Sequence, residues 1–255
     1  MFAETVRTFR KINLIFSILF LVISLSLFAS ARCEALSDAE MALKLTQKLG
    51  SEFEPESMSV RVAGSRAFAE ARGIFLSGVR IDRLQIEAIL SGSDVPEDGN
   101  VESLASLIGY SWGEIELLAS DINEYFKSNE ARGFTDLSVR FSPGGFRAAG
   151  VFTKSLLFTF RIRLSATGNF GLRPDGVYIE DPNVYIENLR QPGFLVNEMI
   201  ERANPLIEWS EIPFKVVFKE IKMTDYSAVM TGGPREFSGG AVAVWNAADR
   251  KADVK

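Results

Sequence analysis

Histidine is absent from this chain of 255 residues, and cysteine occurs once, at Cys33. Without histidine the chain cannot build Ser-His-Asp or Cys-His catalytic groups, use an imidazole as a general base or bind a metal through one. A single cysteine excludes an intrachain disulfide and a cysteine cluster for zinc or an iron–sulfur centre. We therefore expect no metal and no cofactor, and only carboxylate, Ser/Lys and tyrosine chemistry remains open.

An excess of positive charge is also lacking. The chain has 28 lysines and arginines against 33 aspartates and glutamates, which gives a formal net charge of −5. A protein that binds nucleic acid usually needs a basic face to replace the counterions of the phosphates, so we expect no nucleic-acid partner. Hydrophobic residues make up 47% of the chain, which is ordinary for a globular protein with a closed core.

Complete catalytic motifs are missing as well. The glycine pairs Gly144-Gly145 and Gly232-Gly233 lack the Lys-Ser/Thr of a phosphate-binding loop, and no S-x-x-K sequence occurs. The stretch Gly109-Tyr110-Ser111-Trp112-Gly113 matches G-x-S-x-G, but the chain has no histidine to serve as the base of such a serine. Carboxylates cluster at Glu52, Glu54 and Glu56 and again at Glu114 and Glu116, where a solvated face is the simplest interpretation. A carboxylate hydrolase would need an acid pair across a cleft, so it stays a third hypothesis behind two non-enzymatic ones.

The first residues have the order of a secretory signal peptide. Arg7, Arg10 and Lys11 precede an uncharged apolar stretch from Ile12 to Phe28, and an A-x-A cleavage site follows at Ala29-Ser30-Ala31. This pattern predicts a signal peptide at residues 1–31 and export to the periplasm or to the extracytoplasmic face of the inner membrane. The stretch is nearly long enough to span a bilayer, so an uncleaved N-terminal anchor is the alternative.

The rest of the chain predicts an α+β fold. Ser37 and Glu40 form a capping box, followed by apolar residues at helical spacing to Leu49. Strict alternation then predicts strands, and tight turns between neighbouring strands require them to be antiparallel. We expect strands around 58–62, 74–81, 84–90, 114–118, 136–141, 146–153, 158–165, 177–179, 184–186, 214–223 and 227–231, and further helices at 101–108, 120–127 and 192–203.

Residues 32–232 are expected to form one domain, with a flexible tail at 233–255 that is rich in glycine, alanine and charge. The chain contains 20 phenylalanines, and several apolar residues share one face of the alternating strands. Such a face can pack as a closed core, or it can curl around an apolar ligand. The candidate lipid-contacting residues are Leu137, Val139, Phe141, Phe158, Phe160, Ile162, Leu164, Val216 and Phe218.

Two arginines alternate with the apolar residues of the most regular strand. Arg161 and Arg163 flank Ile162, and each can lie on a solvated outer face or on a rim that contacts phosphate headgroups. The sequence alone leaves both interpretations open.

Four segments, taken in their order and spacing, resemble the LmeA-like phospholipid-binding proteins of bacterial envelopes. They are Ile74 to Leu90, Leu117 to Tyr125 with its Asp121-Ile122-Asn123, Phe141 to Phe146 with its Pro143-Gly144-Gly145, and Asn204-Pro205 through Ile212-Pro213-Phe214. The resemblance implies a TULIP-like fold, in which a long helix packs in a strongly curved antiparallel sheet around a lipid-sized tunnel. It also implies export, phospholipid binding and no catalytic residues.

Two hypotheses follow for function. The first is an exported protein that holds or carries phospholipid in an apolar tunnel for envelope maintenance, with phospholipid as its partner and transient membrane contact. The second is a structural or interaction protein of the cell envelope that has a closed core and no enzymatic activity.

Overall fold

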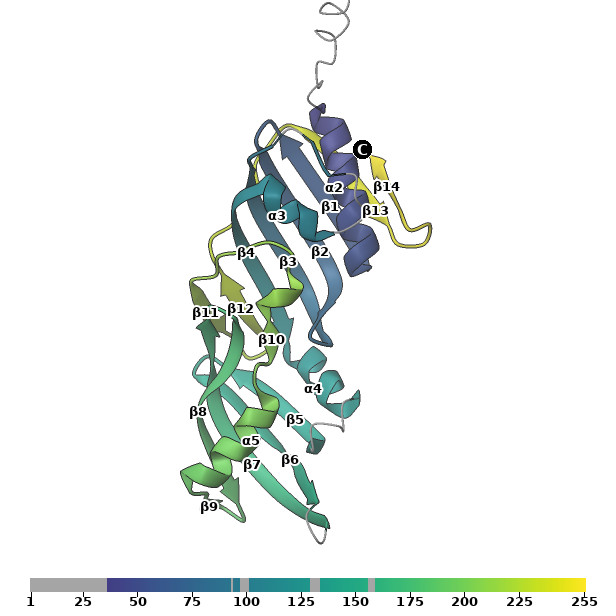
Figure 1. Cartoon of the computed structure of the whole chain (residues 1–255). Coiled ribbons are helices and arrows are strands. Elements are labelled where there is room, and N and C mark those ends of the chain that lie inside the picture. The colour runs from purple at the N-terminus through teal and green to yellow at the C-terminus, as the bar shows by residue number, and fades with distance from the viewer. Residues whose placement is uncertain (1–35, 93, 97–100, 129–133, 156–158) are drawn as a thin grey trace, which may run out of the picture. The chain divides into compact units, whose positions relative to one another are not determined.

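The computed structural model describes residues 36–92, 94–96, 101–128, 134–155 and 159–255, and Leu36–Lys255 form one compact unit. The predicted signal peptide at 1–31, Cys33 and Phe158 lie outside the described residues. The described chain is α+β with antiparallel sheets, as the alternation predicted (Figure 1). In this part of the chain, no helix combines the length and the apolarity needed to cross a membrane.

Sheet A contains eight strands in the order β11-β12-β4-β3-β2-β1-β13-β14, and its pairs are antiparallel. Helix α2 packs on β1 and β13 (Figure 1). The bounds are α2 Asp38–Phe53, β1 Ser57–Ala63, β2 Arg66–Leu76, β3 Val79–Leu90, a 3-10 turn Val101–Ser103, α3 Leu104–Leu107, β4 Ile108–Leu118, β11 Glu220–Met223, β12 Ser227–Thr231, β13 Ala241–Asn246 and β14 Lys251–Val254.

Sheet B has the order β10-β8-β7-β6-β5, with β9 paired to β8. Helix α4 packs against β5 and helix α5 against β8. The bounds are α4 Ala119–Ser128, β5 Phe134–Ser142, β6 Gly145–Ser155, β7 Thr159–Arg173, β8 Gly176–Ile186, β9 Leu189–Arg190, α5 Gly193–Ala203, β10 Ile207–Glu208 and a 3-10 turn Trp209–Glu211.

The capping box at the start of α2 is confirmed. The hydroxyl of Ser37 accepts a hydrogen bond from the Glu40 N–H at 3.3 Å, and the Glu40 carboxylate accepts one from the Ser37 N–H at 2.9 Å. Both bonds satisfy donors that the first turn of a helix otherwise leaves unpaired. The hydrogen bonds from Ser37 also lower the pKa of Glu40.

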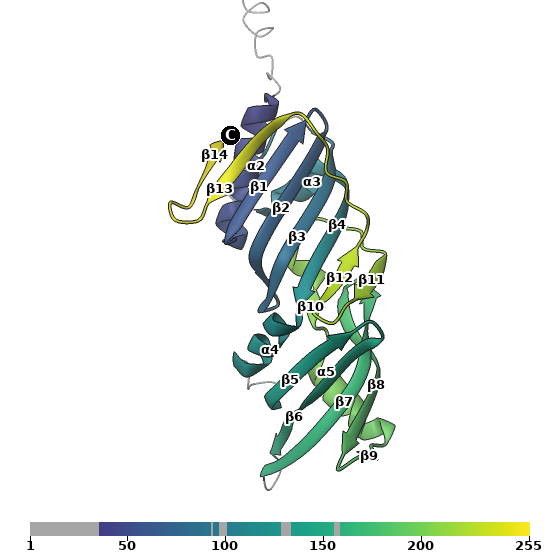
Figure 2. The same cartoon turned by 180° about the vertical axis from the view of Figure 1, so that it is seen from behind.

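The expected flexible tail at 233–255 is wrong. Residues 241–246 form β13, which pairs with β1, and residues 251–254 form β14, which pairs with β13 at that edge of sheet A, while β12 and β11 lie at the other edge (Figure 2). Trp245 is buried there, since the short alternation Ala241-Val-Ala-Val-Trp245 presents it to α2. Pairing with β13 satisfies backbone groups that β1 would otherwise expose at an open edge.

Two predicted strands also need correction. The segment 74–81 is a hairpin and not one strand, because Ser77 and Gly78 take positive φ values of 52° and 78° and turn the chain between β2 and β3. The expected strand 214–223 is reduced to β11 at Glu220–Met223. Before it, Val217 makes only an isolated bridge to Trp112 of β4.

Candidate functional site

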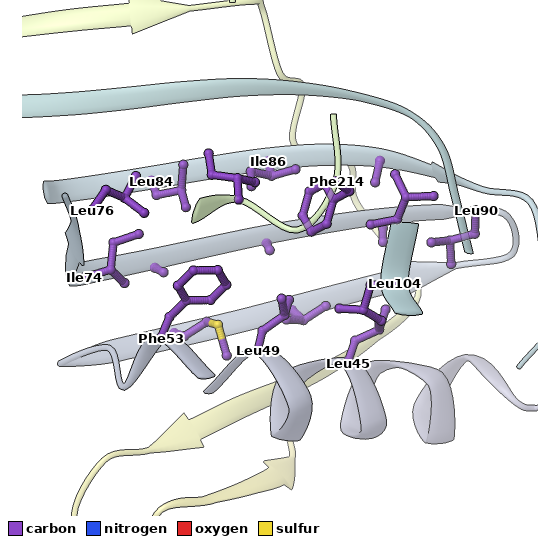
Figure 3. Close-up of a pocket in the computed structure, with 18 residues that line it drawn as sticks. Leu45, Leu49, Phe53, Ile74, Leu76, Leu84, Ile86, Leu90, Leu104 and Phe214 are labelled. Atoms are coloured by element: carbon purple, nitrogen blue, oxygen red, sulfur yellow. The ribbon is translucent and has the colours of Figure 1, made fainter. Parts of the chain in front are cut away.

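An apolar cavity lies between α2 and sheet A (Figure 3). Leu45, Leu49 and Phe53 point from the helix toward the strands, and Leu104 and Phe214 close the space from other segments. The cavity has a volume of about 50 Å³, and each of its lining side chains is apolar. It therefore offers contact to hydrocarbon and no group that could hydrogen-bond a polar ligand.

A row of small side chains leaves this space unfilled. Ala67, Ala69 and Ala71 alternate along β2, and Ala88 lies directly opposite Ala67 on β3. Larger residues surround the row on the neighbouring strands and on α2, so the hollow lies over the alanines. This cavity was not predicted from the sequence, although the alternating alanines are visible there as a pattern of small residues on one strand face.

Gly73 lets the C-terminal residues of β2, Ile74 and Leu76, line the same cavity. The residues that line the cavity change from odd to even numbers between Ala71 and Ile74, and Gly73 has a φ of +66° at this point. A Cβ on Gly73 would lie 2.2 Å from the Glu56 side chain, so both the backbone conformation and the available space require glycine.

A second apolar cavity, of about 60 Å³, lies between sheet B and its helices α4 and α5. Three of its lining residues are small, Ala148, Ala166 and Ala203, and they face larger side chains such as Phe126 and Met199. Leu137, Val139 and Leu164 of the predicted lipid-contacting residues line this cavity. The structure therefore brings these three together on one face of β5 and β7.

The remaining predicted residues are placed elsewhere. Phe141 is buried with its ring edge against Phe170, which itself lines the second cavity. Ile162 is half-buried and is not part of the cavity wall. The side chain of Phe160, like the whole of Phe158, lies outside the described residues.

Val216 and Phe218 line an open groove and not a closed cavity. The groove has a volume of about 760 Å³, and the rings of Phe218 and Trp209 stack in it with their centroids 4.7 Å apart. Its polar residues include Asp175, Glu208 and Lys215. The expectation that Val216 and Phe218 belong to the same wall as Leu164 depended on a strand at 214–223, and that strand is absent there.

Ile212 and Phe214 form the wall between this groove and the cavity of sheet A, because both residues line both spaces. Their side chains are only 7% and 8% exposed.

Arg161 and Arg163 do not border the second cavity. Both are exposed, and they alternate along β7 with Leu164, which points into the cavity. Because successive side chains of a strand point to opposite faces, the two arginines lie on the outer face of sheet B.

The two motif asparagines have a structural role. Asn123 of α4 donates a hydrogen bond to the Val139 carbonyl and accepts one from the Val139 N–H, and Asn204 does the same with both backbone groups of Ile179. Each side-chain amide therefore continues the backbone pairing of a strand, so that Asn123 fixes α4 to β5 and Asn204 fixes the end of α5 to β8.

Four of the five carboxylates singled out in the sequence form ion pairs with arginines. Glu114 and Glu116 both bind Arg83, at 2.9 and 3.3 Å, and Glu56 binds Arg80 through two hydrogen bonds of 2.9 and 3.0 Å. Ion pairs of this kind are typical of a structural surface. Among the described residues, no group of three or more metal-ligating side chains is close enough to hold an ion.

One tyrosine of the groove has a shifted pKa. The Tyr178 hydroxyl donates a hydrogen bond of 2.7 Å to the Asp175 carboxylate, which raises the pKa of Tyr178. The tyrosine therefore keeps its proton and cannot serve as a base at neutral pH.

No protein family, curated protein or solved structure matches the chain.

Proposed function

We propose that the protein is an exported, non-enzymatic binder of phospholipid, which takes an acyl chain through the groove into the apolar cavity of sheet A. The observation that carries this proposal is the shared wall of Ile212 and Phe214, which separates an entirely apolar cavity from an open groove of about 760 Å³. The groove alone is within the size range of small-molecule sites, roughly 300–1,000 Å³.

The cavity in its present form is too small for an acyl chain. Its volume of about 50 Å³ is well below the ~150 Å³ of an apolar cavity that accepts benzene. Loading therefore requires Phe214 to leave its site, at a cost of up to ~3–5 kcal/mol if the loss resembles that of a Phe→Ala change. Burial of eight methylene groups returns about 6 kcal/mol at ~0.8 kcal/mol each, which is enough to offset that cost.

The finer parts of the proposal come from the sequence. Export is supported by the basic, apolar and A-x-A segments between Arg7 and Ala31. A TULIP-like architecture is supported by a helix packed on an antiparallel sheet in each half, α2 on sheet A and α5 on sheet B. The substrate class is supported by the resemblance of four segments to the LmeA-like proteins.

The second candidate is an envelope protein with a closed core, and the small volumes of about 50 and 60 Å³ favour it. In this case the two hollows are packing defects and hold no ligand. The two candidates make opposite predictions for a substitution that fills the cavity.

The experiment compares lipid loading of the wild type with loading of two matched variants. Ala69→Val adds two methyl groups to the cavity of sheet A, and Ala166→Val adds the same two groups to the cavity of sheet B. Each protein is incubated with palmitoyl-oleoyl phosphatidylglycerol and bound lipid is counted by native mass spectrometry. We expect Ala69→Val to lose at least tenfold in bound lipid, while Ala166→Val retains wild-type loading.

A variant that removes the wall tests the route of entry. Phe214→Ala should raise the rate of lipid uptake, and its circular-dichroism melting curve shows whether the fold is kept. A wild type that takes up no lipid, together with an Ala69→Val protein that simply melts at a higher temperature, would establish the closed core and refute lipid binding.

A further inference from the structure

The groove beside the sheet A cavity carries charged side chains of both signs. Asp175, Glu208 and Lys215 line it, and all three residues are exposed. None of the three forms an ion pair with a described residue. Two carboxylates and one ammonium group are therefore available to a molecule that enters the groove.

The two carboxylates belong to neighbouring segments of sheet B. Glu208 of β10 is the register partner of Gly176, the residue that follows Asp175. The Trp209 N–H also donates a hydrogen bond of 3.0 Å to the Asp175 carbonyl. The hydrogen bond to Asp175 is the main cause of the raised pKa of Tyr178, and the negative charge of Glu208 adds to it. Both carboxylates thus act on the same part of the groove.

The lysine comes from the segment that forms the wall of the cavity. Lys215 directly follows Phe214, and its carbonyl accepts a hydrogen bond of 2.6 Å from the Ser111 hydroxyl of β4. The Val217 N–H donates a hydrogen bond of 3.1 Å to the Ser111 carbonyl. These two bonds hold the lysine on sheet A, next to the residue that separates the groove from the cavity.

No other cation of the described chain lines the groove. Arg173 is near, but its guanidinium pairs with Glu180 at 3.4 Å and lies 4.3 Å from the centre of the Tyr178 ring. Alternation places five exposed arginines on the outer face of sheet B, away from the groove: Arg140 of β5, Arg147 of β6, Arg161 and Arg163 of β7, and Arg190 of β9. With two carboxylates and one lysine, the groove has an excess of negative charge.

A zwitterionic headgroup with a primary amine matches these charges. Its phosphate can bind the Lys215 ammonium group, and its amine can donate charge-assisted hydrogen bonds to Asp175 and Glu208. A phosphatidylethanolamine headgroup has no net charge. A phosphatidylglycerol headgroup would instead bring a negative charge, and no amine, to a groove in which carboxylates already outnumber the lysine.

The aromatic rings of the groove favour a primary amine over a quaternary one. Phe218 stacks on one face of Trp209 with the ring centroids 4.7 Å apart, and the Arg173 guanidinium lies over one face of Tyr178. A quaternary ammonium group is recognised by open aromatic faces and has no N–H to donate to a carboxylate. A choline headgroup therefore gains less from this groove than an ethanolamine headgroup does.

We propose that the groove selects phosphatidylethanolamine, with the phosphate at Lys215 and the amine at Asp175 and Glu208. This inference rests on the proposed function, because it assigns the headgroup of the lipid whose acyl chain enters the cavity of sheet A.

The test is a competition among three lipids that share palmitoyl and oleoyl chains. The full chain is incubated with equal amounts of phosphatidylethanolamine, phosphatidylcholine and phosphatidylglycerol, and bound lipids are counted by native mass spectrometry. Because the acyl chains are identical, the ratios report the headgroup alone. We expect phosphatidylethanolamine to exceed phosphatidylcholine about threefold and phosphatidylglycerol about tenfold.

Two substitutions with matched controls locate the preference in the groove. Glu208→Gln should lower the ratio of phosphatidylethanolamine to phosphatidylglycerol about fivefold, whereas Glu201→Gln, on an exposed residue of α5 outside the groove, should keep the wild-type ratio. Lys215→Gln should lower loading of all three lipids about threefold, because each carries a phosphate, and Lys219→Gln, outside the groove, should not. Circular-dichroism melting confirms that each variant is folded.

A wild type that loads phosphatidylglycerol or phosphatidylcholine as readily as phosphatidylethanolamine would overturn this inference and leave lipid binding in place. A wild type that loads none of the three lipids would refute the proposed function as well. Equal changes of the ratio in Glu208→Gln and Glu201→Gln would also overturn the inference, since total charge and not the groove would then decide the preference.

A soluble competitor distinguishes the lipid from a free amine of the same chemistry. Glycerophosphoethanolamine carries the headgroup without acyl chains, so at a concentration equal to that of the lipid it should leave loading of phosphatidylethanolamine unchanged. Displacement of half of the bound lipid would show that the groove takes a soluble phosphoamine, and would overturn the assignment to a lipid headgroup.

Discussion

The arginines of the two sheets differ in whether they form ion pairs with carboxylates. On sheet A they are paired: Arg66 binds the buried Glu87, Arg80 binds Glu56 and Asp121, and Arg83 binds Glu114 and Glu116. On the outer face of sheet B, five exposed arginines have no such partner among the described residues. The arginines of sheet A are neutralised by carboxylates of the same chain. The unpaired arginines of sheet B are therefore the ones available to a partner outside the chain.

The outer face of sheet A is also fastened by the segment between β12 and β13. The Glu87 carboxylate, besides binding Arg66 at 2.6 Å, accepts a hydrogen bond from the Arg235 N–H at 2.8 Å. The Arg66 guanidinium lies 4.6 Å from the centre of the Phe237 ring. The segment between β12 and β13 runs from one edge of sheet A to the other (Figure 2). The paired charges of Arg66 and Glu87 hold it against the sheet.

The largest effect expected from this contrast is on stability. Arg80→Ala should lower the free energy of unfolding by about 2 kcal/mol, because it leaves the largely buried Asp121 carboxylate without its partner. The same change at the unpaired Arg163 should cost less than ~0.5 kcal/mol. Urea unfolding followed by circular dichroism measures both, and equal losses at the two sites would show that pairing does not distinguish the sheets.

The Arg80→Ala loss should also depend on pH. Burial raises the pKa of Asp121 above 3.8, and Arg80 opposes the rise. Without Arg80 the folded-state pKa rises further, so the native variant binds a proton more readily than the unfolded chain. The stability difference from wild type should therefore shrink as pH falls from 7 toward 4, and a constant difference would contradict the assigned cause.

The first helix turns of α2 on sheet A and α5 on sheet B also differ in how they are stabilised. Ser37 caps α2 with a side-chain hydrogen bond, whereas α5 begins after Pro192 with no side-chain cap. Ser37→Ala should lower the free energy of unfolding by about 1 kcal/mol. Pro192→Ala, as the matched change on α5, should leave the thermal midpoint nearly unchanged. A larger loss at Pro192 than at Ser37 would reverse the comparison.

The smallest effect is a gain in stability on sheet B. Arg147→Glu places a carboxylate opposite Arg140 and should raise the free energy of unfolding by roughly 0.5 kcal/mol at low salt. At Arg83 the same change should be destabilising, because Glu114 and Glu116 would then face a third carboxylate. Thermal melts at low and high salt measure the two signs, and a gain at Arg83 would show that its pairing contributes nothing.

Local sequence patterns predicted the helices and strands whose conformation is decided mostly by residues close by in the sequence. The Ser37–Glu40 capping box predicted the start of α2, and the alternation of Met58, Val60 and Val62 predicted β1. The prediction of one strand at 74–81 failed because a two-residue turn at Ser77-Gly78 was hidden inside an apolar run. The strand β13 was missed because its pairing partner, β1, lies far away in the sequence.

The candidate site was predictable only in part, for a physical reason. Leu137, Val139 and Leu164 could be assigned to a shared apolar face because alternation decides which way a strand residue points. Phe214 could not be assigned to the sheet A cavity, since it reaches that cavity from an irregular segment by a long-range contact. Whether alanines under a helix leave a hollow also depends on what packs opposite them.

By itself, the amino-acid sequence determined the absence of histidine chemistry and of an intrachain disulfide, and it determined the alternation that makes the chain α+β. Only the tertiary structure decided that Ile212 and Phe214 line both an apolar cavity and an open groove, and that arginines from four strands meet on one face. Residue types and local periodicity are properties of the chain. Cavities and charged faces arise from pairing between distant segments, which local patterns do not encode.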